Sequence, residues 1–216
     1  MVTAYNPRSD AESQPRVAAV ILAAGKSSRM GEPKQLLRLG ENTVLGQTIE
    51  NVRRSVLREI ILVLGDSAEA IRRQLTLPES LNLVINPSWQ QGMASSLRAG
   101  LSAVSHQTEG ALILLADQPF VHPETLNRLV EQHRQSRAQI VIPTHRGVRG
   151  NPVLLDRSVF AEVMALEGDV GCRAIFANHV QGIVKVEVDD EGILLDIDNQ
   201  DDYQRLRNVN PNPITE

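Results

Sequence analysis

Short apolar runs alternate with amphipathic segments over the first 140 residues, and this alternation restricts the possible fold more than any other feature of the sequence. Runs such as ILVLG and ALILLA are apolar throughout, which is typical of strands that are covered on both faces. Strands that alternate with helices form βαβ units around a parallel sheet. The sequence therefore predicts one α/β domain over residues 17–207, with flexible tails at 1–16 and 208–216.

The bounds of the predicted strands and helices follow from segment length and hydrophobic periodicity. The later strands lie closer together than the earlier ones, which predicts a small antiparallel addition to a mostly parallel sheet. The predicted strands are Val17–Leu22, Ile60–Leu64, Asn82–Ile85, Ala111–Ala116, Gln139–Pro143, Pro152–Leu155, Ile183–Val188 and Ile193–Leu195. The predicted helices are Val44–Ser55, Ala68–Leu75, Met93–Val104, Pro123–Arg134 and Arg157–Ala165.

Charge and cysteine content exclude several classes of protein. The formal net charge is −4 and the pI is near 5.8, which gives no general attraction to nucleic acid or to an anionic membrane. No apolar run approaches the roughly 20 residues that span a bilayer, and residues 1–16 contain no apolar core of a secretory signal. The single cysteine, Cys172, allows no internal disulfide and is typical of a reducing compartment. We therefore expect a cytoplasmic protein without nucleic-acid or membrane partners, which binds anionic ligands at a local site.

The segment after the first predicted strand contains Gly25-Lys26-Ser27, the last three residues of a phosphate-binding P-loop. That motif is GxxxxGK[ST], and its first glycine would fall at Val20, inside the strand. The sequence also contains no GxGxxG segment after a strand, so a dinucleotide-binding loop has no support. The loop is therefore not that of a P-loop ATPase or of a dinucleotide oxidoreductase.

The same loop has the residue types of a different polyphosphate site. Ala23, Ala24 and Gly25 let the backbone approach a ligand closely, and bare loop amides bind anionic oxygens. Three cations follow, namely Lys26, Arg29 and Lys34. The loop lies at the carboxyl end of a strand, where open α/β sheets bind their ligands. The alternative is a solvated basic loop without a ligand.

Aspartates at two places have the chemistry of a Mg²⁺ site, since this ion takes one or two carboxylates together with phosphates and water. Asp117 follows the strand ALILLA at the same edge as the glycine loop, although it could equally form a turn or cap a helix. Asp196 and Asp198 lie two residues apart in an extended segment and point the same way. They could instead be solvated acids ahead of a final helix that Asn199 or Asp201 caps.

Three further segments carry weaker signals. Gly92, Met93 and Ser96 precede or begin a helix, where amides and hydroxyls could bind a base edge or a phosphate, although Ser95 could merely cap that helix. The turns at 147–152 and 168–173 could close over a substrate, but turn geometry alone would explain their glycines. The five histidines lack zinc-like spacing, and Cys172 has no evident histidine partner.

Several of these motifs together resemble one family. The segment LAAGKSSRMGEPKQLL resembles the signature loop of the MobA-like nucleotidyltransferases, and it is most similar to the molybdenum cofactor cytidylyltransferases within them. The resemblance continues in order through GMASSLRAG, LLADQP, VIPTHRGVRGNPVLL, LEGDVGCRA and DIDNQDDY. It implies a single-domain, Rossmann-like three-layer fold of the nucleotide-diphospho-sugar transferase type. It also implies Mg²⁺-dependent transfer of CMP from CTP to the terminal phosphate of molybdopterin or molybdenum cofactor, with release of pyrophosphate.

The resemblance also implies a role for each residue that matches a family motif. Related guanylyltransferases have a segment similar to LAGG where this chain has LAAG. The methyl group of Ala24 narrows the space under the base and therefore favours CTP over GTP. The implied catalytic residues are Arg29, Lys34 and Asp117. The implied nucleotide-binding residues are Leu22, Ala23, Ala24, Gly25, Lys26, Ser27, Arg29, Lys34, Gly92, Met93 and Ser96. The implied metal ligands are Asp117 and Asp196, with Asp198 as the substitute, and the implied acceptor-binding residues are Arg149, Gly150, Asn151 and Asp169.

Two departures from the family pattern affect the acceptor side. Family members often have His at Asn151, and they tend to have Thr-Pro at Asn199-Gln200. The alternatives are therefore a related transferase that uses GTP or a sugar or polyol phosphate, and a non-catalytic protein that binds or delivers a pterin cofactor. A molybdoenzyme or a maturation chaperone is the implied macromolecular partner.

Overall fold

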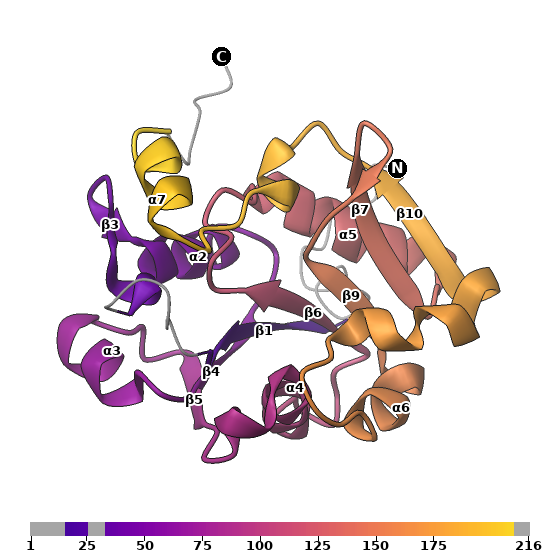
Figure 1. Ribbon diagram of the computed structural model, residues 1–216. Helices are drawn as coiled ribbons and strands as arrows, with labels where there is room; N and C mark the ends of the chain where they lie inside the picture. Colours follow the sequence, from indigo (N-terminus) through magenta and orange to yellow (C-terminus); the bar gives the residue numbers. More distant parts are fainter. Residues whose placement is uncertain (1–15, 26–32, 210–216) are drawn as a thin grey trace, which may run out of the picture.

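The computed structural model describes residues 16–25 and 33–209 and consists of a twisted sheet with helices on both faces (Figure 1). Lys26, Ser27 and Arg29 lie outside the described residues. The strands of the main sheet are β1 (Val17–Ala23), β4 (Glu59–Leu64), β5 (Leu81–Ile85), β6 (Gly110–Leu115), β7 (Ile140–His145), β8 (Val148–Arg149), β9 (Val153–Asp156) and β10 (Ile183–Glu187). The helices are α2 (Val44–Arg53), α3 (Ala68–Gln74), α4 (Met93–Ser102), α5 (Pro123–Ser136), α6 (Phe160–Met164) and α7 (Gln200–Leu206).

The strand order is β10-β7-β9-β6-β1-β4-β5, with β8 paired to β7. Strand β1 lies inside the sheet and pairs in parallel with both β4 and β6, so that Val20 is opposite Ile61 on one side and Ile113 on the other. Strand β9 runs antiparallel to both of its neighbours, β6 and β7. A separate antiparallel pair is formed by β2 (Arg38–Leu39) and β3 (Asn42–Thr43). The mostly parallel sheet with a small antiparallel part is confirmed.

The two faces of the sheet bury two separate apolar clusters. Alternate residues of β1 point to opposite faces, so Ile21 packs in one cluster and Val20 in the other. The first cluster includes side chains of α2, α3 and α5, and the second includes side chains of α4 and α6. Gly100 lets α4 approach β1 closely, since a Cβ atom there would lie 2.4 Å from Cγ1 of Val20. The result is the three-layer arrangement seen in Figure 1, with the carboxyl ends of β1, β4 and β6 at one edge.

One predicted strand is wrong. Residues Ile193–Leu195 were expected to be extended, but the 3₁₀-helix η5 (Glu191–Leu194) occupies most of this segment. The buried carboxylate of Asp190 caps it by accepting the backbone N–H of Gly192 at 2.9 Å, and it also accepts the N–H of His122 and the hydroxyl of Thr125. This capping bends the chain at 190–192, so the apolar residues that follow pack against the sheet without joining it.

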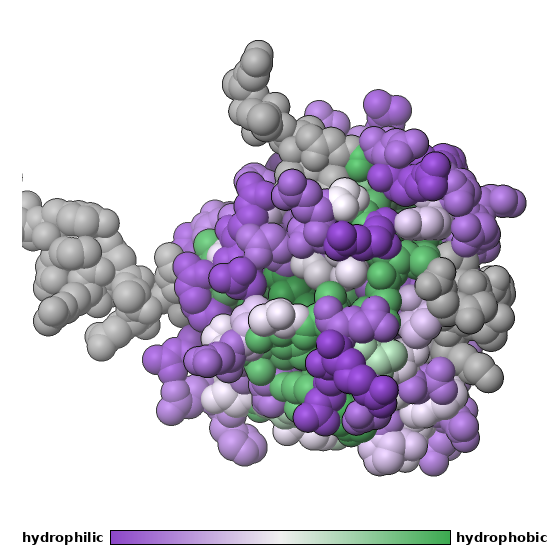
Figure 2. All heavy atoms as spheres, turned by 90° about the vertical axis from the view of Figure 1, so that its left-hand side faces the viewer, coloured by the Kyte–Doolittle hydropathy of each residue, from purple (hydrophilic) through white to green (hydrophobic). Residues whose placement is uncertain are grey.

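The surface is mostly polar in the part of the chain that the structure describes. Seen from the side of α3 and β3, hydrophilic residues surround an apolar area in the middle of the face (Figure 2). No helix among the described residues is both long and apolar enough to cross a membrane.

Candidate active site

Two cavities meet at the carboxyl edge of β1 and β6. The first, which we call the loop cavity, has a volume of about 630 Å³ and lies beside the loop that follows β1. The second, which we call the β9 cavity, has a volume of about 380 Å³ and lies over β6 and β9. Leu22, Met93, Leu115 and Asp117 line both cavities, so a ligand in one would lie next to a ligand in the other.

The structure gathers every described residue of the predicted nucleotide site around the loop cavity. Segments that are far apart in the sequence contribute, since the loop after β1, the start of α4 and the residue after β6 all reach it. The described residues of that prediction are Leu22, Ala23, Ala24, Gly25, Lys34, Gly92, Met93 and Ser96, and all eight line this cavity.

The turn before α4 is held against the turn at 168–169. Gly92 has a φ of +96°, and a Cβ atom there would lie 2.5 Å from the carbonyl carbon of Gly168. The backbone N–H of Met93 donates to Oδ1 of Asp169 at 3.2 Å, and the N–H of Ala94 donates to the carbonyl of Gly168. Asp169 was expected on the acceptor side, but it lines the loop cavity and holds the start of α4.

Sequence reasoning missed residues that line the loop cavity or support its loop, including Gln35, Gly65 and Trp89. The side-chain amide of Gln35 donates to the carbonyls of Ala23 and Gly25, each at 3.4 Å, and so supports the loop from below. Gly65 follows β4, and a Cβ atom there would lie 2.5 Å from the carbonyl oxygen of Ala24. Trp89 lines the cavity. A glycine at the end of ILVLG and the only tryptophan were visible in the sequence, whereas nothing there distinguished Gln35.

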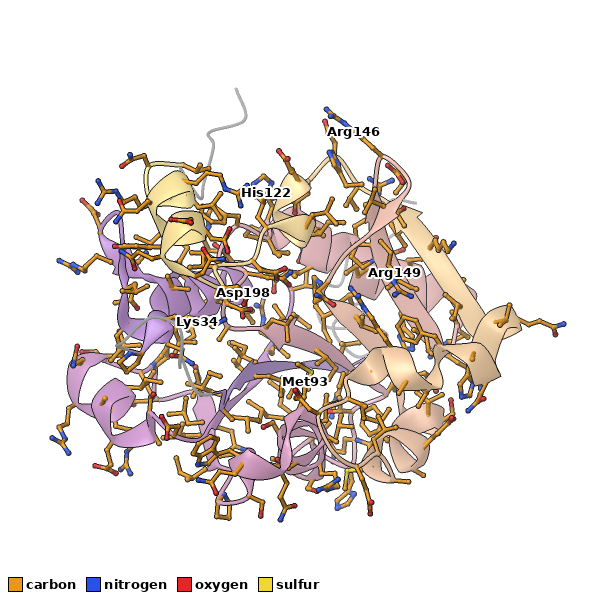
Figure 3. The ribbon with its side chains drawn as sticks, in the orientation of Figure 1. Lys34, Met93, His122, Arg146, Arg149 and Asp198 are labelled. Atoms are coloured by element: carbon orange, nitrogen blue, oxygen red, sulfur yellow. The ribbon has the colours of Figure 1, made fainter. Side chains whose placement is uncertain are left out.

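Lys34 forms ion pairs with two carboxylates from distant parts of the chain. Its Nζ lies 2.6 Å from Oδ2 of Asp117 and 3.0 Å from Oδ1 of Asp198, and Figure 3 shows Lys34 and Asp198 side by side. Burial lowers the pKa of Lys34, but the charges and hydrogen bonds of Asp117 and Asp198 outweigh it, and the net pKa is raised. Lys34 is therefore a fixed positive charge at the point where the two cavities meet.

The acids around Lys34 concentrate negative charge. Burial, followed by the charges of Asp117 and Asp198, raises the pKa of Asp196 to about 6. Asp196 and Asp198 both line the β9 cavity, together with Asp117. Oδ1 of Asp117 is buried and accepts no hydrogen bond from any residue in 16–25 or 33–209. An unpaired carboxylate oxygen next to further acids is a position that a hard cation would fill.

These residues fit a divalent cation whose remaining coordination positions are filled by the substrate. Within the described residues, no group of three or more His, Cys, Asp or Glu side chains has the arrangement of a complete metal site. Mg²⁺ does not require one, because it usually takes one or two carboxylates and fills its other positions with phosphate oxygens and water. Asp117 with Asp196 or Asp198 supplies that number of ligands.

The predicted acceptor residues do not all reach the β9 cavity. Asn151 lines it, whereas Arg149 ends β8 and Gly150 follows that strand, and neither lines the cavity. Gly150 packs against the carbonyl of Ile193, where a Cβ atom would lie 2.4 Å from the oxygen, and the N–H of Asn151 donates to that same oxygen at 3.1 Å. Gly150 thus joins the turn to η5 without contacting a ligand position.

Cys172 is buried where η4 (Cys172–Gly182) begins, and burial raises the pKa of its thiol to about 12. The reactive species of a cysteine is the thiolate, which is nearly absent at pH 8 when the pKa is this high. We expect the folded protein to react with Ellman's reagent at pH 8 at least about 100-fold more slowly than the urea-unfolded chain. Equal rates in the two states would contradict the burial of Cys172.

A small-residue anion loop, a fixed lysine and an acid cluster at the carboxyl edge of a mostly parallel sheet together define a nucleotidyltransferase site. The chain belongs to the family with the MobA-like NTP transferase domain, whose model matches residues 19–183. The family expected from the sequence motifs is therefore confirmed.

The chain is also similar to curated relatives and to a solved structure. Nicotine blue oxidoreductase of Paenarthrobacter nicotinovorans is 31% identical over 199 residues, which cover 89% of this chain and 97% of the relative. The molybdenum cofactor cytidylyltransferase of Escherichia coli strain K12 is 27% identical over 189 residues, which cover 87% and 93%. The crystal structure of Rv0371c of Mycobacterium tuberculosis H37Rv in complex with manganese matches with a TM-score of 0.78 at 31% identity, covering 90% of this chain and 100% of that one.

Proposed function

We propose that this protein transfers CMP from CTP to the terminal phosphate of a molybdopterin-type acceptor. The observation that supports this most strongly is the contact between the two cavities at Asp117, beside Lys34. A nucleoside triphosphate in the loop cavity would present its α-phosphate to an acceptor in the β9 cavity. The name of the Escherichia coli relative supports CTP and the molybdenum cofactor as the substrate pair.

The proposed reaction is an in-line displacement at the α-phosphorus. A phosphate oxygen of the acceptor attacks that atom and forms a new P–O bond, while the bond to the bridging oxygen of the β-phosphate breaks. Pyrophosphate leaves with the electron pair of the broken bond, so no covalent enzyme intermediate is required. Catalysis of this kind depends on positioning and on neutralising charge.

The loop after β1 would position the triphosphate, and Lys34 would neutralise its charge. The backbone from Ala23 to Gly25 lies along the loop cavity and is supported by Gln35, which fixes the positions of its amides. Lys34 carries the positive charge that would neutralise the oxygens of the reacting phosphates. Arg29, which lies outside the described residues, has the same proposed role.

Asp117 and Asp196, with Asp198 as the substitute, would hold the divalent cation. When bound, Mg²⁺ would neutralise phosphate charge and orient the triphosphate. The negative charges that raise the pKa of Asp196 would then be balanced by the cation, which would favour the ionised form of Asp196.

The choice of base depends on the floor of the loop cavity. Ala24 is buried, and its methyl group narrows the space next to the loop backbone. We expect Ala24→Gly to raise the GTP-to-CTP ratio of kcat/KM about tenfold or more, because a methyl group in a pocket is worth about 1–3 kcal/mol of discrimination. Measuring both nucleotides in the same preparation cancels any loss of folded protein. An unchanged ratio would show that another residue selects the base.

The experiment that tests the proposal is pyrophosphate release with CTP, GTP, ATP or UTP, each with and without molybdenum cofactor. The expected result is release that requires CTP, the cofactor and Mg²⁺ together, and that stops on chelation of the metal. Release with a different nucleotide would support the proposed transferase reaction but reject CTP as the nucleotide substrate. Tight binding of the cofactor without release under any condition would reject catalysis and favour a delivery protein.

A further inference from the structure

Asn86 is a buried polar residue that follows the edge strand β5 and lines neither cavity. Its backbone N–H donates to the carbonyl of Leu64 at 2.8 Å, which continues the pairing of β5 with β4 by one residue. Only 3% of Asn86 is exposed. The sheet therefore holds Asn86 in place, and its side-chain amide must find its hydrogen-bond partners inside the protein.

The direction of each hydrogen bond to the Asn86 side chain follows from its partners. Oδ1 lies 2.9 Å from the backbone nitrogen of Ser88, which can only donate, so the amide oxygen must face this group. The amide nitrogen Nδ2 then donates to Oγ of Ser95 at 2.9 Å and to Oγ of Ser96 at 3.1 Å. Both hydroxyl oxygens in the first turn of α4 are therefore acceptors toward Asn86.

Each of the two hydroxyl groups retains its own proton, because a hydroxyl can accept and donate at the same time. Ser95 donates its proton to the carbonyl of Gly92 at 2.8 Å. No residue in 16–25 or 33–209 accepts the proton of Ser96, and Ser96 lines the loop cavity, whereas Ser95 does not. The proton of Ser96 is therefore available to a ligand in the loop cavity.

The charges around the loop cavity indicate which part of a nucleotide would meet Ser96. Among the described residues that line this cavity, Lys34 is the only cation, and it adjoins Gln35, which supports the loop after β1. On the side of α4, the carboxylate of Asp169 accepts the N–H of Met93, and in Figure 3 Met93 lies apart from Lys34. Phosphate groups are attracted to Lys34 and repelled by Asp169, so the base end of the nucleotide would lie toward Ser96.

We propose that Asn86 is a positioning residue, which makes the hydroxyl of Ser96 a hydrogen-bond donor toward the base end of the nucleotide. This inference rests on the proposed function only for the presence of a nucleoside triphosphate in the loop cavity. Without the amide donor of Asn86, the Ser96 hydroxyl would be free to present either its proton or its lone pairs. Asn86 thus makes the site select a hydrogen-bond acceptor on the base, in addition to the selection by size at Ala24.

The test is the substitution Asn86→Asp, which preserves the size of the side chain and the acceptor for Ser88 but replaces the NH₂ donor with an oxygen. An ionised carboxylate only accepts hydrogen bonds, so the proton of Ser96 would turn toward it and away from the cavity. We expect the affinity for CTP with Mg²⁺, measured by calorimetry at pH 8, to fall about tenfold. Inorganic tripolyphosphate has the phosphates without the base, so its affinity should be unchanged.

The readout is the ratio of the affinity for CTP to the affinity for tripolyphosphate. General damage to the cavity, or the added negative charge, would weaken both ligands and would not lower this ratio. Thermal unfolding and retained binding of tripolyphosphate show that each variant is folded. A lower ratio therefore reports a contact with the base end of the nucleotide.

Ser96→Ala and Ser95→Ala are a matched pair, because Asn86 donates to both hydroxyl groups and only Ser96 lines the loop cavity. Ser96→Ala, which adds no charge, should lower the ratio about as much as Asn86→Asp. Ser95→Ala should leave the ratio unchanged. In the double variant, Asn86→Asp should add little to the effect of Ser96→Ala, because a positioning residue has no effect without the group that it positions.

The proposed function and this inference fail in different ways. An unchanged ratio in Asn86→Asp, or additive effects in the double variant, would overturn the role of Asn86 even if CMP transfer is observed. A ratio that falls in both single variants, without CMP transfer to a pterin acceptor, would reject the proposed reaction and retain the role of Asn86. Where transfer occurs, Asn86→Asp should raise the KM for CTP about tenfold and leave the KM for the acceptor unchanged.

Discussion

Replacing Lys34 with alanine is expected to lower kcat by about 100- to 1,000-fold, because removal of one preorganised charge donor at a reacting centre costs that much in other enzymes. The ammonium group lies between Asp117 and Asp198, where the two cavities meet. The same substitution should increase the affinity of the protein for a divalent metal ion. With Lys34 removed, the two carboxylates lose their internal cation, so the nucleotide-free protein should bind Mn²⁺ several-fold more tightly, as measured by electron paramagnetic resonance.

The comparison variant is Lys185→Ala, since Lys185 is an exposed lysine of β10 outside both cavities. Its turnover and Mn²⁺ affinity should match those of the wild type. Near-normal turnover of folded Lys34→Ala would reject its catalytic role. Weaker Mn²⁺ binding by that variant would show that Lys34 does not compete with the cation for these carboxylates.

The positions of the loop and of Asp117 could be predicted because they depend on local patterns. Strands β1 and β6 are continuous apolar runs, and a residue shortly after each strand breaks the run, Gly25 in one case and Asp117 in the other. Parallel strands bring such ends to one edge of the sheet. For the same reason Gly92 and the start of α4 fall there, since they follow the edge strand β5, which runs parallel to β4.

Contacts between distant segments could not be predicted from the sequence. Asp198 reaches Lys34 across 164 positions, and only the folded chain shows that η5 and the following segment pass over the end of β6. The alternative that Asn199 caps a final helix is also correct, because its Oδ1 accepts the N–H of Asp202 at 2.9 Å at the start of α7. Capping by Asn199 and proximity of Asp198 to the site are therefore compatible.

The surroundings of Arg149 show the same limit on the acceptor side. Arg149 was selected from a family motif, whereas Arg173 was read only as part of a glycine-flanked turn. The guanidinium carbon of Arg149 lies 5.1 Å from the centre of the Phe176 ring, which belongs to η4. No spacing rule connects a two-residue strand with a 3₁₀-helix, so this side of the site required the structure.

Replacing Asp117 with asparagine is expected to abolish Mg²⁺-dependent nucleotide binding and to lower turnover at least about 1,000-fold. Asparagine has nearly the same size but no charge, so it removes one proposed metal ligand and one of the two ion-pair partners of Lys34. The charge of Asp117 is also one cause of the raised pKa of Asp196, and its loss should bring that pKa down from about 6 toward the ordinary value.

Calorimetric titration of CTP with and without Mg²⁺ measures the loss of metal-dependent nucleotide binding. Carboxyl ¹³C chemical shifts across pH 3–8 measure the pKa of Asp196. Asp189→Asn serves as the control, because Asp189 is exposed and lines neither cavity. A CTP affinity that still increases with Mg²⁺ in Asp117→Asn would assign the metal to other residues. An unchanged pKa of Asp196 in that variant would mean that burial and the charge of Asp198 raise it without a contribution from Asp117.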